Sequence, residues 1–82
     1  GSIVENFVVL EKTPPAGRSL AEMDIRKKTG ATVIAIVREN QPISNPAPDF
    51  VLAAGDLLIV MGTHRSLSAV QSLLAGETLG KI

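Results

Sequence analysis

The 82-residue sequence contains no cysteine, tryptophan or tyrosine, and only two phenylalanines. Without cysteine, the chain has neither a disulfide framework nor a thiolate metal site. Its eight basic and eight acidic residues give a formal net charge of zero, so no overall field draws it to nucleic acid or lipid. Exposed aromatic residues and a basic stripe, which single-strand nucleic-acid binding requires, are also missing. We therefore expect no nucleic-acid partner.

Patterns that carry catalysis or cofactor binding are missing as well. His64 is the only histidine, and no nucleophile elbow is present to complete a serine–histidine–acid triad. The glycines form neither the G-x-G-x-x-G fingerprint nor a P-loop. Asp49 and Asp56 occupy turn positions, which explain them better than acid–base chemistry, and no calcium-loop spacing is present. The sequence thus indicates a protein that is not an enzyme and has no metal site or cofactor.

Apolar residues make up 45% of the chain, yet its longest apolar runs are only as long as a strand. Val33–Val37 and Leu57–Met61 fall far short of the roughly 20 residues of a membrane-spanning helix. A chain of this length forms one domain with a thin core. The surplus of apolar residues therefore favours burial of part of the surface against a partner, most simply a second copy.

The first part of the chain predicts a strand followed by a helix. Ile3–Leu10 is rich in β-branched residues, which is typical of a strand. Two prolines in the next loop exclude both helix and central strand. Ser19 and Glu22 have the spacing of a capping box, and this predicts a helix from about Leu20 to Lys28 that stops at Gly30.

The rest of the chain predicts three strands and a second helix. Ala31–Val37 is a continuous apolar run, the pattern of a strand that is covered on both faces. A short strand around Ile43 and a proline-containing bend come next, and the strand Leu57–Met61 follows a tight turn. Thr63 is a good N-cap for a last helix through about Ala75.

This order of elements predicts a small α+β domain over residues 3–76, with a β-α-β-β-β-α arrangement and helices packed on the sheet. We expect residues 1–2 to be the remnant of a cleaved expression tag. Residues 77–82 form a C-terminal tail without a clear assignment.

The first predicted helix carries its apolar residues on two arcs. At about 100° per residue, Leu20 and Met23 share one arc, while Ala21 and Ile25 share another. Two arcs predict two neighbours, which are the domain's own sheet and something beyond it. Around this helix, basic residues outnumber acidic ones by four to two: Arg18, Arg26, Lys27 and Lys28 against Glu22 and Asp24.

Two interpretations of this region stay open. The charges fit an ordinary solvated helix face, with Glu22 and Arg26 as an i,i+4 pair, but an apolar shelf beside an arginine also suits a flat base that carries a phosphate. Likewise, Pro46 and Pro48 either hold a rigid wall beside a binding groove or only shape a connection and block edge pairing.

A set of features extends from about Val8 to Leu74, through the segment AGRSLAEMDIRKKTGATVIAIVRENQPISNPAPDFVLAAGDLLIVMGT. They are Gly17, Leu20, Arg26, Ala35-Ile36-x-Arg38, Pro46, Pro48, Gly55-Asp56 and Gly62. In this order and spacing, the chain resembles the TrkA C-terminal domain, also called the RCK C-terminal domain.

The resemblance implies a regulatory domain at the cytoplasmic face of the membrane, attached to or associated with a potassium channel, potassium uptake system or cation/proton antiporter. It also implies a two-fold homodimer. Several members of the family bind cyclic di-AMP across the dimer interface. Carried over by position, such a site here would comprise Leu20, Ala21, Asp24, Ile25, Arg26, Thr32 and Pro48.

Each of these residues has an implied role. Leu20, Ala21 and Ile25 would form a shelf for adenine, and Asp24 and Arg26 would supply polar contacts. Thr32 would donate to a phosphate, and Pro48 would form the opposite wall. Two positions depart from the family pattern, because position 32 is often asparagine in members that bind and Ala21 is smaller than the usual aliphatic residue.

Three functions follow from the sequence. The leading hypothesis is a ligand-sensing domain that binds cyclic di-AMP and gates transport. The alternatives are a structural dimerisation module without a small ligand, and a sensor of another solute or a divalent cation.

Overall fold

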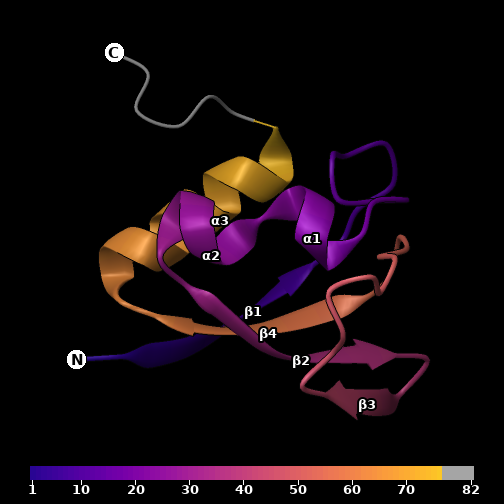
Figure 1. Ribbon diagram of the computed structural model, residues 1–82, viewed down its shortest axis with the longest axis horizontal. Coiled ribbons are helices and arrows are strands. Elements are labelled where there is room, and N and C mark those ends of the chain that lie inside the picture. Colours follow the sequence, from indigo (N-terminus) through magenta and orange to yellow (C-terminus); the bar gives the residue numbers. More distant parts are fainter. Residues whose placement is uncertain (77–82) are drawn as a thin grey trace.

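The computed structural model describes residues 1–76 and contains one four-stranded antiparallel sheet with helices packed on it (Figure 1). The elements are β1 (Ile3–Val8), α1 (Leu20–Met23), α2 (Ile25–Thr29), β2 (Thr32–Arg38), β3 (Gln41–Ser44), β4 (Leu57–Gly62) and α3 (His64–Ala75). In the sheet the strands follow the order β1-β4-β2-β3. The predicted α+β class and order of elements are confirmed, and the predicted tail lies outside the described residues.

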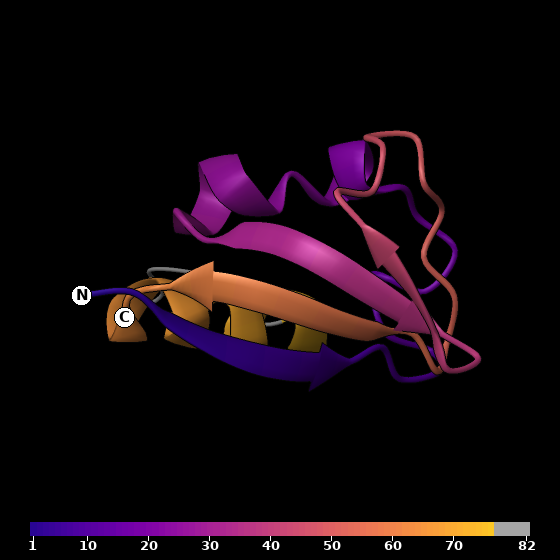
Figure 2. The ribbon, with the colours of Figure 1, turned by 90° about the horizontal axis from the view of Figure 1, so that it is seen from below.

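The helices cover one face of the sheet. Along the central strand β4, Leu58 and Val60 are fully buried, whereas Leu57 and Ile59, which alternate with them, are only half-buried. This alternation has the period of a strand with one covered face, and Figure 2 shows β1 and β4 in front of α3, with α1 and α2 above β2. Within residues 1–76, the prediction that the Ala31–Val37 run is covered on both faces is therefore wrong.

The uncovered face, which we call the open sheet face, carries exposed apolar side chains. Val4, Val8 and Met61 lie on this face, where Val4 on β1 pairs with Met61 on β4. The three residues are 56%, 52% and 39% exposed. A strand that carries apolar residues on both of its faces appears in the sequence as one continuous apolar run. The open sheet face therefore accounts for the surplus of apolar residues in the composition.

The last helix follows its sequence signals closely. The side chain of Thr63 accepts a hydrogen bond from the backbone N–H of Ser66 as the N-cap of α3, and Gly76 closes the helix in a left-handed conformation. Leu67, Val70 and Leu74 are buried in the core, as their spacing predicts.

Gly62 lies so close to the start of α3 that a side chain does not fit there. A Cβ atom at this position would overlap the hydroxyl of Ser66 and lie 3.2 Å from the Cβ of Ala31. That hydroxyl is held in place, since it accepts from Thr63 N at 2.8 Å and donates to the Thr63 carbonyl at 3.1 Å. The junction of β4 and α3 therefore requires glycine for reasons of space.

We expect Gly62→Ala to lower the free energy of unfolding by about 2 kcal/mol, the usual cost of overpacking, as measured by urea denaturation. The matched control is the same change in a Ser66→Ala background, in which the overlapping oxygen is absent. There Gly62→Ala should cost clearly less. An equal cost in both backgrounds would show that the overlap is not the cause.

The first helix is interrupted, and the prediction of one continuous helix from Leu20 to Lys28 is wrong. The capping box of Ser19 and Glu22 and the stop at Gly30 are present as predicted. Between them, Asp24 adopts a left-handed conformation with φ 51° and ψ 45°, which ends α1 and begins α2. Aspartate tolerates this conformation better than most residues.

The interruption changes which side chains face the core. Met23 and Ile25 on either side of Asp24 are 3% and 4% exposed, while Ala21 is exposed to solvent. We expected Ala21 and Ile25 to share an outward arc, and this prediction is wrong because the left-handed residue turns Ile25 toward the core.

Candidate functional site

A surface cavity of about 340 Å³ lies between α1, α2, the start of β2 and the loop that follows β3. Its lining consists of Leu20, Ala21, Asp24, Ile25, Arg26, Thr32, Val33, Pro46 and Pro48. The structure thus gathers around one cavity all seven residues that the resemblance implied. Sequence reasoning missed Val33, and it placed Pro46 in the bend without assigning it to the site.

One side of the cavity is apolar. Leu20 is half-buried and Ala21 is exposed on α1, so both present hydrocarbon surface to the cavity. Ile25 also lines the cavity, but it belongs to the hydrophobic core and is only 4% exposed. It therefore supports the apolar wall from behind, because the break at Asp24 turns it toward the core.

The opposite side is the loop that carries Pro46 and Pro48, and backbone hydrogen bonds fix its distance from α1. Ala21 N donates to the carbonyl of Pro48 at 2.8 Å, and Leu20 N donates to the carbonyl of Phe50 at 3.0 Å. The first N–H groups of a helix have no partner within it, so the loop satisfies them here. Figure 1 shows this loop running beside α1.

The polar groups of the cavity come from three residues. Asp24 and Thr32 are half-buried, and Arg26 is exposed on α2. Within residues 1–76, the single ion pair closer than 4 Å is that of Arg38 and Asp56, so the pair of Glu22 and Arg26 that one of the two open interpretations contained does not form. The guanidinium of Arg26 therefore has its donors available at the cavity.

Glu22 is occupied with the helix cap. Its Oε1 accepts a hydrogen bond from the backbone N–H of Ser19 at 2.8 Å. The hydrogen bonds from Ser19, first from its backbone and then from its side chain, lower the pKa of Glu22. The carboxylate is thus turned toward the start of α1, which explains why it does not reach Arg26.

A second polar cluster holds the far end of the loop. Arg38 donates from Nε and Nη2 to the two carboxylate oxygens of Asp56, at 2.8 and 2.7 Å. The backbone N–H of Ala53 also donates to Asp56, at 2.8 Å. Asp56 is 2% exposed, and the hydrogen bonds from Arg38 are the main cause that lowers its pKa.

The sequence reasoning treated Asp56 as a turn residue and missed this ion pair. The signal that would have found it is the register of β2 and β4, in which Val37 lies opposite Leu57. In an antiparallel pair the residue after Val37, Arg38, faces the residue before Leu57, Asp56, so the register places the two charges side by side.

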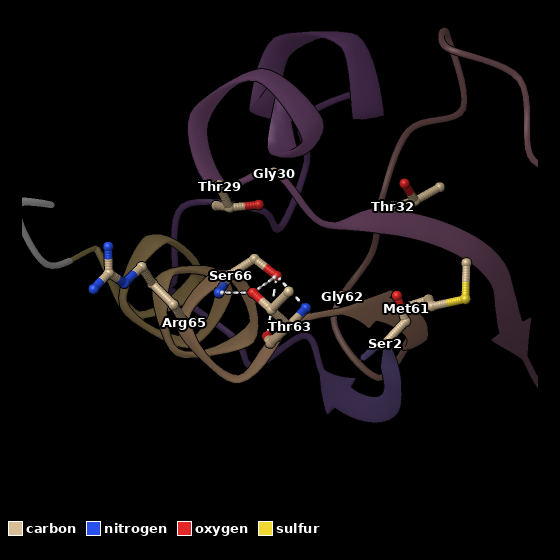
Figure 3. Close-up of a pocket in the computed structure, with 9 residues that line it drawn as sticks. All are labelled: Ser2, Thr29, Gly30, Thr32, Met61, Gly62, Thr63, Arg65 and Ser66. Carbon is tan, nitrogen blue, oxygen red and sulfur yellow. Dashed lines mark hydrogen bonds between the residues drawn. The ribbon is translucent and has the colours of Figure 1, made fainter.

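Another cavity, of about 310 Å³, lies at the start of α3 and is shown in Figure 3. Its hydroxyl groups serve the ends of the helices: Thr63 and Ser66 bond to each other, and Thr29 donates to the carbonyl of Ile25. Arg65 extends away from these hydroxyls in Figure 3. The hydroxyls of Thr29, Thr63 and Ser66 in this cavity are therefore already engaged at the ends of the helices.

Within residues 1–76, no three His, Cys, Asp or Glu side chains cluster as metal ligands would. In this same part of the chain, every helix falls short of the length and hydrophobicity that a membrane crossing requires.

The model of the TrkA-C domain family matches residues 4–75. The chain belongs to the TrkA-C domain family. This TrkA-C domain is 37% identical over 71 residues to the probable potassium channel protein 2 of Methanocaldococcus jannaschii, covering 87% of this chain and 21% of that protein. It is 35% identical over 77 residues to the K(+)/H(+) antiporter subunit KhtT of Bacillus subtilis, covering 92% of this chain and 47% of that protein. It thus spans half or less of their length.

Solved structures of RCK_C domains have the same fold. The RCK_C domain dimer of S. agalactiae BusR in complex with c-di-AMP superposes with a TM-score of 0.79 at 27% identity, over 87% of this chain and 93% of that one. The RCK C domain of the potassium transport protein KtrA, in complex with cyclic diadenosine monophosphate, gives 0.80 at 32% identity, over 87% and 81%. The chain is thus a regulatory domain of the type found in potassium and cation transport proteins.

Proposed function

We propose that this TrkA-C domain senses cyclic di-AMP at the interface of a homodimer and thereby gates an attached or associated potassium or cation transport protein at the cytoplasmic face of the membrane. The observation that carries the proposal is the convergence of Leu20, Ala21, Asp24, Ile25, Arg26, Thr32 and Pro48 on one cavity. The two RCK_C structures solved with this nucleotide support the choice of ligand.

The chemistry of the cavity suits one half of a cyclic dinucleotide. The apolar side chains of α1 and the ring of Pro48 form two sides of a slot for an adenine. Burying one adenine face of about 80 Å² would contribute roughly 2 kcal/mol. Asp24 offers a carboxylate to the exocyclic amine, while Arg26 and Thr32 offer donors to a phosphate.

A two-fold dimer would repeat these contacts on the second half of the ligand. Cyclic di-AMP carries two adenines and two phosphates related by symmetry, so an isologous interface matches it with one set of residues per protomer. Exposed Val4, Val8 and Met61 supply apolar surface that a dimer would cover. A ligand that prefers one of two dimer arrangements would shift the population toward it and so bias the transport domain.

Titration calorimetry of the purified chain with cyclic di-AMP, cyclic di-GMP and linear dinucleotides tests the proposal, with light scattering to measure the oligomeric state. We expect binding of cyclic di-AMP at one molecule per two chains. A stable dimer that releases no heat with any nucleotide would favour the structural dimerisation module. A thermal shift with divalent cations, reversed by chelation, would favour the cation sensor.

A further inference from the structure

Arg38 lies at the end of β2, outside the cavity beside α1. All its partners nevertheless belong to the loop that carries Pro46 and Pro48, which we call the proline wall of that cavity. Besides Asp56, its Nη2 donates to the carbonyl of Val51 at 2.9 Å. Its guanidinium carbon also lies 4.7 Å from the centroid of the Phe50 ring. One side chain thus contacts three points of the segment between residues 50 and 56.

A short chain of contacts connects this segment to the cavity. Phe50 N donates to the carbonyl of Ala47 at 3.0 Å, which closes the turn that contains Pro48. On the other side, the carbonyls of Pro48 and Phe50 accept from the first amides of α1. The proline wall is therefore held from two directions, by α1 on the cavity side and by Arg38 on the far side.

We propose that Arg38 is a positioning residue for the cavity, which holds the proline wall at the separation from α1 that a planar base requires. This inference rests on the proposed function for its ligand, but its structural part is independent of any ligand. The arrangement needs an arginine, because only a planar guanidinium bridges both carboxylate oxygens and a carbonyl while it stacks on a ring. A lysine at this position would keep the charge and lose the fork.

The ligand-free test is amide hydrogen exchange, measured by NMR on the wild-type chain and on Arg38→Lys. We expect the amides of Leu20, Ala21 and Leu52, whose hydrogen bonds join the loop to the α1 region, to exchange about tenfold faster in the variant. The amides of Lys28 and Gly30, bonded within α2, should keep their wild-type rates. Uniform acceleration of all amides, or no change at the loop, would overturn the proposal.

Two further variants keep this test decisive. Phe50→Leu removes the ring and leaves the ion pair, so it should give the same selective pattern with a smaller amplitude even if Arg38→Lys fails to fold. Arg65→Lys is the matched control, since Arg65 is exposed at the other end of the domain and should leave every loop amide unchanged. An identical effect of Arg65→Lys would also overturn the proposal.

The ligand test is a double-variant cycle with cyclic di-AMP. We expect Arg38→Lys and Pro48→Ala each to weaken binding about tenfold, and the double variant to bind about as well as the weaker single variant, because both changes act on one wall. If the two losses of affinity multiply in the double variant, or if Arg38→Lys binds with unchanged affinity, Arg38 does not act through Pro48, and this would overturn the proposal. If the wild-type chain binds no cyclic di-AMP, the proposed function fails, and the exchange experiment alone decides the role of Arg38.

Discussion

Replacing Arg26 with alanine should abolish the binding of cyclic di-AMP and leave the dimer folded. The side chain is exposed on α2, so its removal should change stability by less than about 0.5 kcal/mol. Each protomer would lose charge-assisted hydrogen bonds to one phosphate, worth about 1.5–3 kcal/mol. With two copies per ligand, the affinity should fall by roughly two to four orders of magnitude.

Titration calorimetry measures this loss, with light scattering and a thermal melt to confirm the folded dimer. Lys28→Ala is the matched control, because it removes the same charge from the same helix at a residue outside the cavity lining. It should weaken binding only slightly, and less still at higher salt. An unchanged affinity in Arg26→Ala would rule out the site, and equal losses in both variants would point to unspecific attraction.

Replacing Asp56 with alanine should lower the free energy of unfolding by about 3 kcal/mol, the low end of the range for breaking a buried ion pair. The carboxylate is 2% exposed and accepts from Arg38 and from Ala53 N, so its loss removes the partner of both donors. The side chain of Arg38 is 36% exposed and regains water, which limits the cost. Urea denaturation measures the change.

Asp49→Ala is the control for this prediction. Asp49 is also an aspartate in a turn, but it is exposed, so its replacement should cost less than about 0.5 kcal/mol. Similar losses in the two variants would mean that the ion pair adds nothing beyond turn chemistry.

The same ion pair should make the domain sensitive to acid. Because the folded chain lowers the pKa of Asp56 below its ordinary value of 3.8, its stabilisation is present above that value. It is lost as the pH falls through the lower, folded pKa. Stability should therefore fall below about pH 4, and this part of the slope should be absent in Asp56→Asn. Glu22→Gln, which removes another carboxylate with a lowered pKa, should retain it.

Local signals in the sequence were sufficient for most of the fold. The capping box of Ser19 and Glu22, the cap at Thr63 and the stop at Gly30 depend on residues within one helical turn, and all are present in the structure. The spacing of apolar residues in the last helix likewise reports directly on its buried face. Such features need no knowledge of the rest of the chain.

Features that depend on tertiary contacts were not predictable in this way. Helical periodicity assumes an unbroken helix, so it placed Ile25 outward and gave no sign of the left-handed Asp24. The pair of Arg38 and Asp56 joins residues 18 apart in the sequence, and only strand register brings them together. The seven site positions came from the resemblance to a family, and long-range backbone hydrogen bonds from α1 to the loop are what gather them.

The most direct test of the proposed ligand site is amide chemical-shift mapping of the isotope-labelled chain during titration with cyclic di-AMP. Binding in the cavity beside α1 predicts the largest shifts at Ala21, Arg26, Val33 and Ala47, which lie on or next to its walls. Shifts concentrated instead at Thr63 and Arg65, around the cavity at the start of α3, or no shifts at saturating ligand, would contradict the account.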